Sequence, residues 1–147
     1  PSTWAENIVE QAEKDGLRLS YHTPYRLNIH RDEFCKLAWQ TIQTVNPNIN
    51  LPELAQPFSD CDEDIVRQIA ALGIVTGYED GTFCPDQPVT RAEAVKMING
   101  ALGRIPEEGH LAELISRNPF QDVDESHWAY GNILEASVAH NPDGTLA

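Results

Sequence analysis

The sequence predicts a mainly α-helical protein built from three helix–loop–helix repeats. Apolar residues recur every three or four positions in several segments, which is typical of helices with one buried face. Thr-x-x-Glu pairs at Thr3 and Glu6 and at Thr90 and Glu93 mark helix starts, because each pair satisfies first-turn backbone N–H groups. Hydrophobic residues form 41% and charged residues 22% of the 147-residue chain, the balance of a folded globule.

The helical periodicity and the turn residues between segments place the elements. Helices are predicted at 4–15, 31–45, 61–72, 91–102 and 128–139, with a shorter one at 111–115 after a loop at 104–110. Asp15-Gly16 ends the first helix, and Asn46-Pro47-Asn48 ends the second. Asp80-Gly81 predicts a turn in a small loop or hairpin, and Asn141-Pro142-Asp143-Gly144 predicts another.

Related residues recur at corresponding points of the helix pairs. His30-Arg31-Asp32-Glu33 and Thr90-Arg91-Ala92-Glu93 each open the second helix of a pair. The first helices of the same two pairs end at Gly16-Leu17 and Gly73-Ile74. The first two pairs are therefore copies of one unit.

A third copy begins but lacks its second helix. Its opening, Pro119-Phe120-Gln121-Asp122, repeats Pro57-Phe58-Ser59-Asp60. The repeats are predicted at 1–57, 58–118 and 119–147. Since neither helix of a repeat can bury its apolar face alone, we expect the copies to pack as one compact domain.

Charge and hydropathy exclude several classes of partner. The net charge of −13 argues against binding nucleic acid and against docking on anionic lipid, both of which need a basic face. No apolar run is long enough to insert into a membrane. The chain starts at Pro1 rather than Met, so we expect a piece of a longer protein with further domains.

Neither a metal, a cofactor nor an active site is expected. The Asp80-Gly81, Asp122-Val123-Asp124 and Asp143-Gly144 segments lack the alternating ligands of a calcium loop and are interpreted as turns. No nucleophile elbow, phosphate loop or zinc motif occurs, so the chain is predicted not to be an enzyme. The cysteines lack zinc spacing and are interpreted as small buried hydrophobic residues: Cys35, Cys61 and Cys84.

The middle repeat carries a specific combination of short motifs. They are Phe58-Ser59-Asp60, Gly73-Ile74-Val75-Thr76-Gly77, Asp80-Gly81-Thr82-Phe83, Pro85 and Thr90-Arg91-Ala92-Glu93. This combination resembles the S-layer homology family, whose unit has an aromatic-x-Asp opening, a Trp-Ala helix, a glycine-rich loop and a Thr-Arg-Ala-Glu helix. The first repeat keeps the helices without the loop, and the third keeps only the opening.

The resemblance implies both a fold and a function. The implied fold is a pseudo-threefold helical prism of three repeats. The implied function is non-covalent anchoring of an extracellular protein to the bacterial cell wall. The implied ligand is a wall polysaccharide, often bearing a pyruvate ketal, which binds in grooves between repeats.

The resemblance also implies a set of ligand-binding residues, in which the motif arginine meets a carboxylate. On this chain they are Arg91, Arg31, Gly77, Trp4, Trp128, Asp60 and Asp122. Arg91 is the main candidate, because a planar guanidinium can bond both carboxylate oxygens and because the first turn of a helix favours an anion. Arg31 is its equivalent in the repeat that has lost the loop.

Each of these residues also has a local explanation, which stays open beside the ligand role. Arg91 could pair with a nearby acid, and Gly77 could be required by the backbone. The two tryptophans could pack in the core, and the two aspartates could cap helices. Two other functions also stay open: a protein-interaction or assembly module, and an appendage of a secreted enzyme.

Overall fold

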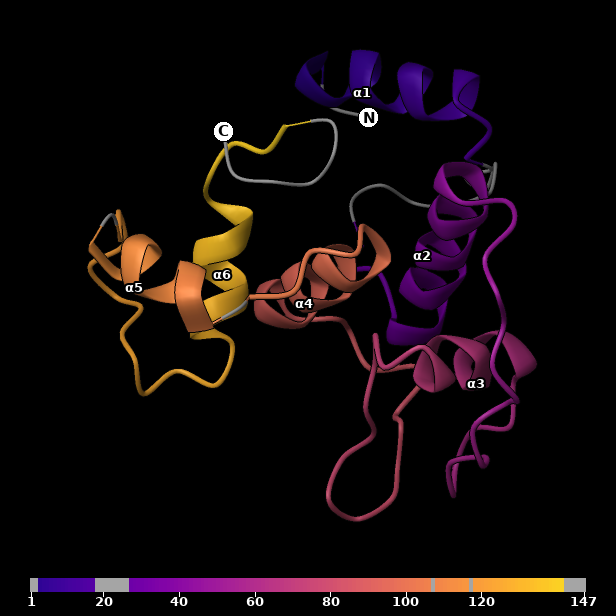
Figure 1. The fold of residues 1–147 in the computed structure, drawn as a ribbon. Helices are drawn as coiled ribbons and strands as arrows, with labels where there is room; N and C mark the ends of the chain where they lie inside the picture. The colour runs from indigo at the N-terminus through magenta and orange to yellow at the C-terminus, as the bar shows by residue number, and fades with distance from the viewer. Residues whose placement is uncertain (1–2, 18–26, 107, 117, 142–147) are drawn as a thin grey trace. The chain divides into compact units, whose positions relative to one another are not determined.

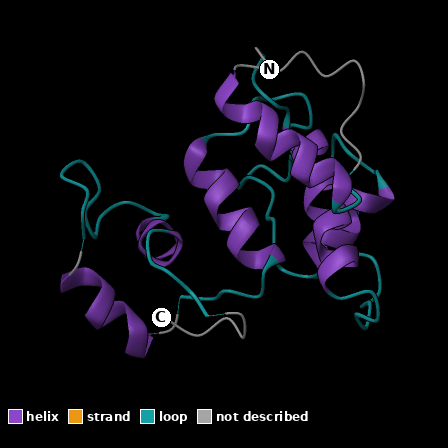
Figure 2. Ribbon diagram, turned by 90° about the horizontal axis from the view of Figure 1, so that it is seen from above, coloured by secondary structure: helices purple, strands orange, loops and turns teal. Residues whose placement is uncertain are grey.

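The computed structural model describes residues 3–17, 27–106, 108–116 and 118–141. The helices are α1 (Thr3–Lys14), α2 (Arg31–Val45), α3 (Asp64–Ala71), α4 (Arg91–Ala101), α5 (Glu108–Ser116) and α6 (Tyr130–Ala136) (Figure 1). Throughout the described part of the chain, the regular elements are helices joined by loops, and extended pairing is limited to isolated bridges (Figure 2). The predicted mainly α class is confirmed.

The chain divides into two compact bodies, Pro1–Val89 and Thr90–Ala147. The boundary falls inside the second repeat, immediately before its second helix. The repeat boundaries at 57 and 118, and the packing of all three repeats as one domain, remain predictions. None of the helices described is both long and apolar enough to cross a membrane.

The core of the first body forms where α2 contacts α3 (Figure 1). The buried apolar residues come from α2, from the turn before α3, from α3 and from the loop after it: Cys35, Ala38, Ile42, Cys61, Val66, Ile69, Ile74, Val75 and Phe83. Val66, Ile69 and Phe83 are fully buried, and each such side chain contributes about 1.5–3 kcal/mol to folding. This core therefore joins α2 to the loop of the following repeat.

The core of the second body lies where α6 contacts α4 and α5. Leu114, Tyr130 and Leu134 form a buried cluster, with Val123 and Val138 packed against it. A polar contact accompanies this core. Asn99 of α4 is 1% exposed, and its amide donates to the backbone carbonyl of Asn132 at 2.9 Å.

Three predicted helix boundaries need correction. The third helix begins at Asp64 rather than 61, because the preceding residues form a turn in which the Phe58 N–H donates to the Cys61 carbonyl at 2.9 Å. The last helix is shorter than 128–139, since a turn ending at Tyr130 precedes it and the Ser137 N–H closes its end on the Leu134 carbonyl. The helix predicted at 111–115 extends over Glu108–Ser116 and takes up part of the expected loop.

Candidate functional site

The loop between α3 and α4 carries most of the motif residues of the middle repeat. Its tip is a tight turn in which the Asp80 carboxylate accepts hydrogen bonds from the Thr82 N–H at 3.0 Å and from the Thr82 hydroxyl at 2.7 Å. The Tyr78 N–H donates to the Thr82 carbonyl at 2.8 Å across this turn. Gly81 has a φ of 83°, which favours glycine. The predicted turn at Asp80-Gly81 is confirmed.

Gly77 lies where the loop backbone passes close to an aromatic ring. A Cβ at this position would lie 2.6 Å from Cε1 of Phe58 and 2.7 Å from the Thr82 carbonyl oxygen. The Phe58 ring in turn contacts the Phe83 ring at a centroid distance of 5.2 Å. Close packing of the backbone therefore accounts for glycine at this position.

Arg31 reaches from the start of α2 into the same loop. Its Nε donates to the Phe83 carbonyl at 2.9 Å, and its Nη2 donates to the Thr76 carbonyl at 3.4 Å. The guanidinium carbon lies 4.9 Å from the centroid of the Tyr78 ring and 4.7 Å from that of Phe83. Arg31 is only 4% exposed, and these contacts account for it without a ligand.

The backbone at the start of α2 binds the same loop further along. The N–H groups of Arg31 and Asp32 donate to the carbonyls of Gln87 and Pro85 at 3.0 and 3.2 Å. His30 also forms an antiparallel bridge with Pro88. Two of the N–H groups that a helix start would offer to an anion are therefore already bonded in α2.

Asp60 binds the backbone of the loop after the Asp80-Gly81 turn. Its carboxylate accepts the N–H groups of Phe83 at 2.7 Å and Cys84 at 2.8 Å. These bonds, chiefly the one from Phe83, hold the pKa of the Asp60 carboxyl below its usual value. Glu63 is the N-cap of α3, so the interpretation of Asp60 as a helix cap is wrong.

Arg91 occupies the first turn of α4 and is exposed. Thr90 caps this helix: its hydroxyl accepts the Glu93 N–H at 3.2 Å, and the Glu93 carboxylate accepts the Thr90 N–H at 2.8 Å. The predicted capping box is confirmed. Among the residues with described positions, no group forms a hydrogen bond or ion pair with Arg91, so its guanidinium differs sharply from that of Arg31.

The remaining predicted site residues are scattered. Trp128 precedes α6, is 62% exposed and stacks on His127 at a centroid distance of 5.9 Å, so of its two interpretations the one that packs it in the core is wrong. Asp122 is exposed, and Ala129 is the N-cap of α6, so Asp122 does not cap that helix. Trp4 belongs to α1 by its backbone, but its side chain lies outside the described residues, as do residues 142–144 of the turn predicted at 141–144.

The three cysteines differ in their burial. Cys35 and Cys61 are buried as predicted, whereas Cys84 is partly exposed. Burial raises the pKa of the Cys35 thiol to about 12. Over the residues that the structure describes, no group of three or more His, Cys, Asp or Glu side chains could hold a metal ion.

The motif residues of the middle repeat coincide with a family match. The S-layer homology domain model matches residues 59–95, which include Asp60, Gly77, the Asp80-Gly81 turn and Arg91. Residues 59–95 are an S-layer homology domain. The matched segment covers the loop between α3 and α4, which Arg31 and Asp60 contact, and the start of α4.

Curated relatives of the chain are surface proteins. It is 31% identical to cell surface glycoprotein 1 of Acetivibrio thermocellus over 94% of this chain and 6% of that protein. It is 28% identical to the cellulosome-anchoring protein of the same organism over 78% of this chain and 25% of that protein. A cell surface protein of Thermoanaerobacter kivui is 38% identical over 52% of this chain and 10% of its own length.

The chain spans at most a quarter of the length of these relatives. No solved structure matches it. The S-layer homology domain and the surface-protein relatives support a cell-surface anchoring module with an extracellular location.

Proposed function

We propose that the chain anchors its protein to the bacterial cell wall by non-catalytic, non-covalent binding of a wall polysaccharide. The observation that carries this proposal is the exposed guanidinium of Arg91, at the start of α4 and inside the segment that matches the family. The equivalent Arg31 is 4% exposed and bonded to the loop. Arg91 is therefore the motif arginine that can reach a ligand.

The chemistry of Arg91 fits a carboxylate on the polymer, such as that of a pyruvate ketal. A guanidinium can donate two parallel hydrogen bonds to the two carboxylate oxygens. The capping box leaves Glu93 bonded to Thr90, and the partial positive charge of the helix start favours an anion beside Arg91. Both effects act on the same ligand group.

The acidity of the chain limits how an anionic polymer can bind. A net charge of −13 repels a polyanion at long range, so binding must come from short-range contacts. Trp128 offers one such contact, because an exposed aromatic face can stack on a sugar ring. We retain Trp4, Asp122, Asp60, Gly77 and Arg31 as lesser candidates, the last three through the shape of the loop.

A second candidate function, an assembly module, is favoured by exposed apolar side chains along and after α4. Ile98 is 46% exposed, Leu102 36% and Ile105 72%. Apolar side chains in such a group can mark a protein-interaction surface. On this alternative, a neighbouring protein rather than a polysaccharide would hold the chain at the cell surface.

Co-sedimentation with purified cell-wall sacculi separates the two functions. Intact sacculi are compared with sacculi from which the secondary polymer has been extracted, and released polymer is added as a competitor. The proposal expects the chain to pellet with intact sacculi only and to be displaced by the polymer. Equal sedimentation with both preparations, or with neither, would contradict polysaccharide binding and favour the assembly module.

A further inference from the structure

We propose that Arg31 is a positioning residue, which holds the loop of the S-layer homology segment in the shape needed for wall binding. The proposal rests on the proposed function. It assigns to the first repeat, which has lost its own loop, the task of shaping the loop of the second. Binding by the intact repeat then depends on a side chain outside the segment that matches the family, residues 59–95.

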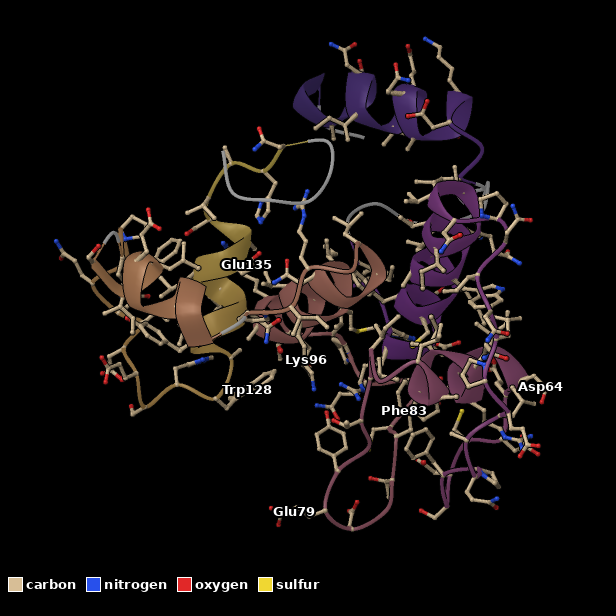
Figure 3. All side chains as sticks on the ribbon, in the orientation of Figure 1. Asp64, Glu79, Phe83, Lys96, Trp128 and Glu135 are labelled. Atoms are coloured by element: carbon tan, nitrogen blue, oxygen red, sulfur yellow. The ribbon has the colours of Figure 1, made fainter. Side chains whose placement is uncertain are left out.

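The guanidinium of Arg31 bonds to both limbs of the loop, the one before the Asp80-Gly81 turn and the one after it. The Thr76 carbonyl lies on the limb that leaves α3, and the Phe83 carbonyl lies on the limb that returns from the turn. Arg31 donates to both, and the Tyr78 and Phe83 rings lie against its guanidinium. Figure 3 shows Phe83 at the base of the loop and Glu79 at its tip. The limbs are thus tied at the base, while the turn at the tip stays exposed.

The backbone of α2 extends the same contact beyond the turn. The carbonyls of Pro85 and Gln87 accept the first-turn N–H groups of α2, and the Val89 N–H donates to the Ile29 carbonyl at 3.0 Å. The loop is therefore held against the start of α2 from Thr76 to Val89. The Arg31 side chain and the first-turn backbone of α2 therefore both bind this loop.

Burial makes the side-chain contact costly to lose. A guanidinium that is 4% exposed has given up its hydration, and the two carbonyls and two aromatic rings replace it. Removing the guanidinium would leave the Phe83 carbonyl without this partner at a buried residue. Arg31 belongs to a repeat that lacks the loop. Its contact with the loop of the next repeat explains why an arginine stands at this position.

The test compares Arg31→Met and Arg31→Lys with a matched control, Arg67→Met. Arg67 lies in the same body, and its Nε also donates to a backbone carbonyl, that of Ala55, at 2.9 Å. This bond holds a different segment. Amide hydrogen exchange is followed at Tyr78 and Gly81, whose N–H groups close the turn, and affinity is measured by co-sedimentation with intact sacculi.

We expect Arg31→Met to speed exchange at Tyr78 and Gly81 and to weaken wall binding, each about tenfold, because the binding shape becomes a minor population. Arg31→Lys should recover part of both losses, and Arg67→Met should change neither. Unchanged exchange in the Arg31 variants, or an equal effect of Arg67→Met, would overturn the proposal. If Arg31→Met does not fold, Arg31→Lys is judged by the same two readouts.

The two readouts also separate this proposal from the proposed function. If the unaltered chain does not bind sacculi, wall binding is wrong, and exchange at Tyr78 and Gly81 still decides whether Arg31 holds the loop. If the chain binds and the Arg31 variants exchange faster but bind equally well, the positioning role is wrong while wall binding stands.

Discussion

Asp60 and Arg31 hold opposite sides of a single residue, Phe83. The Asp60 carboxylate accepts the Phe83 N–H at 2.7 Å, and Nε of Arg31 donates to the Phe83 carbonyl at 2.9 Å. The Phe83 side chain is itself fully buried. The returning limb of the loop is therefore fixed by a carboxylate from the turn before α3 and a guanidinium from α2.

The Asp60 contact predicts a stability that depends on pH. Since hydrogen bonds hold the folded-state pKa of this carboxyl below its usual value, its contribution is present above the unfolded-state pKa and is lost as pH falls through the folded-state pKa. Asp60→Asn should therefore lower the free energy of unfolding at neutral pH, and the loss should shrink in acid. Urea unfolding at about pH 7 and about pH 3 measures both.

The control for this prediction is Asp62→Asn, a nearby exposed carboxylate. It should leave the free energy of unfolding nearly unchanged at both pH values. An Asp60→Asn effect of the same size in acid as at neutral pH would contradict the role given to the carboxylate charge.

Gly77→Ala should destabilise the first body by about 1–3 kcal/mol, because a Cβ has no room beside Phe58 and the Thr82 carbonyl. Thermal unfolding measures the loss. Thr76→Ala is the matched control, since Thr76 is exposed and contributes its backbone carbonyl to Arg31. A Gly77→Ala protein as stable as Thr76→Ala would show that the loop can shift at no cost.

Thr90→Ala should cost about 1 kcal/mol of stability through loss of the helix cap. Thr90→Ser should restore most of it, because the hydroxyl that accepts the Glu93 N–H remains. Wall binding measured well below the unfolding temperature should be retained. Loss of binding with unchanged thermal unfolding would instead assign Thr90 to the ligand.

Cys35 should resist alkylation in the folded protein up to about pH 9, because the thiolate is the reactive form and burial raises the pKa of this thiol to about 12. Cys84, which is partly exposed, should react first. Mass spectrometry after iodoacetamide treatment gives the order of labelling. Early labelling of Cys35 would contradict the packing of α2 on α3.

Local sequence signals predicted the helices well where the helix ends are determined locally. The second helix was predicted at 31–45 and is observed at Arg31–Val45, and the fourth, predicted at 91–102, ends one residue earlier. Both begin at a capping box, formed by His30 with Glu33 in α2 and by Thr90 with Glu93 in α4. Apolar periodicity and caps act within a few residues, so the sequence shows them directly.

The errors arise where distant residues decide the structure. The start of the third helix was misplaced because Asp60 bonds to Phe83 and Cys84 rather than to its own helix. The contact of Arg31 with the loop joins residues from two repeats, so no pattern among neighbouring residues predicts it. The loss of the loop in the first repeat predicts a lesser ligand role for Arg31 than for Arg91, but it does not predict that Arg31 is only 4% exposed.

Titration of pyruvylated wall-polymer fragments against Arg91→Ala is the most direct measurement of the central claim. Arg104→Ala, which removes one positive charge elsewhere in the same body, is the control. Loss of a desolvated guanidinium–carboxylate pair should cost roughly 2–5 kcal/mol of binding free energy, with the fold intact. Arg91→Lys should recover only part, because an ammonium lacks the planar fork. Equal affinity for the unaltered chain and Arg91→Ala, or binding by neither, would contradict the account.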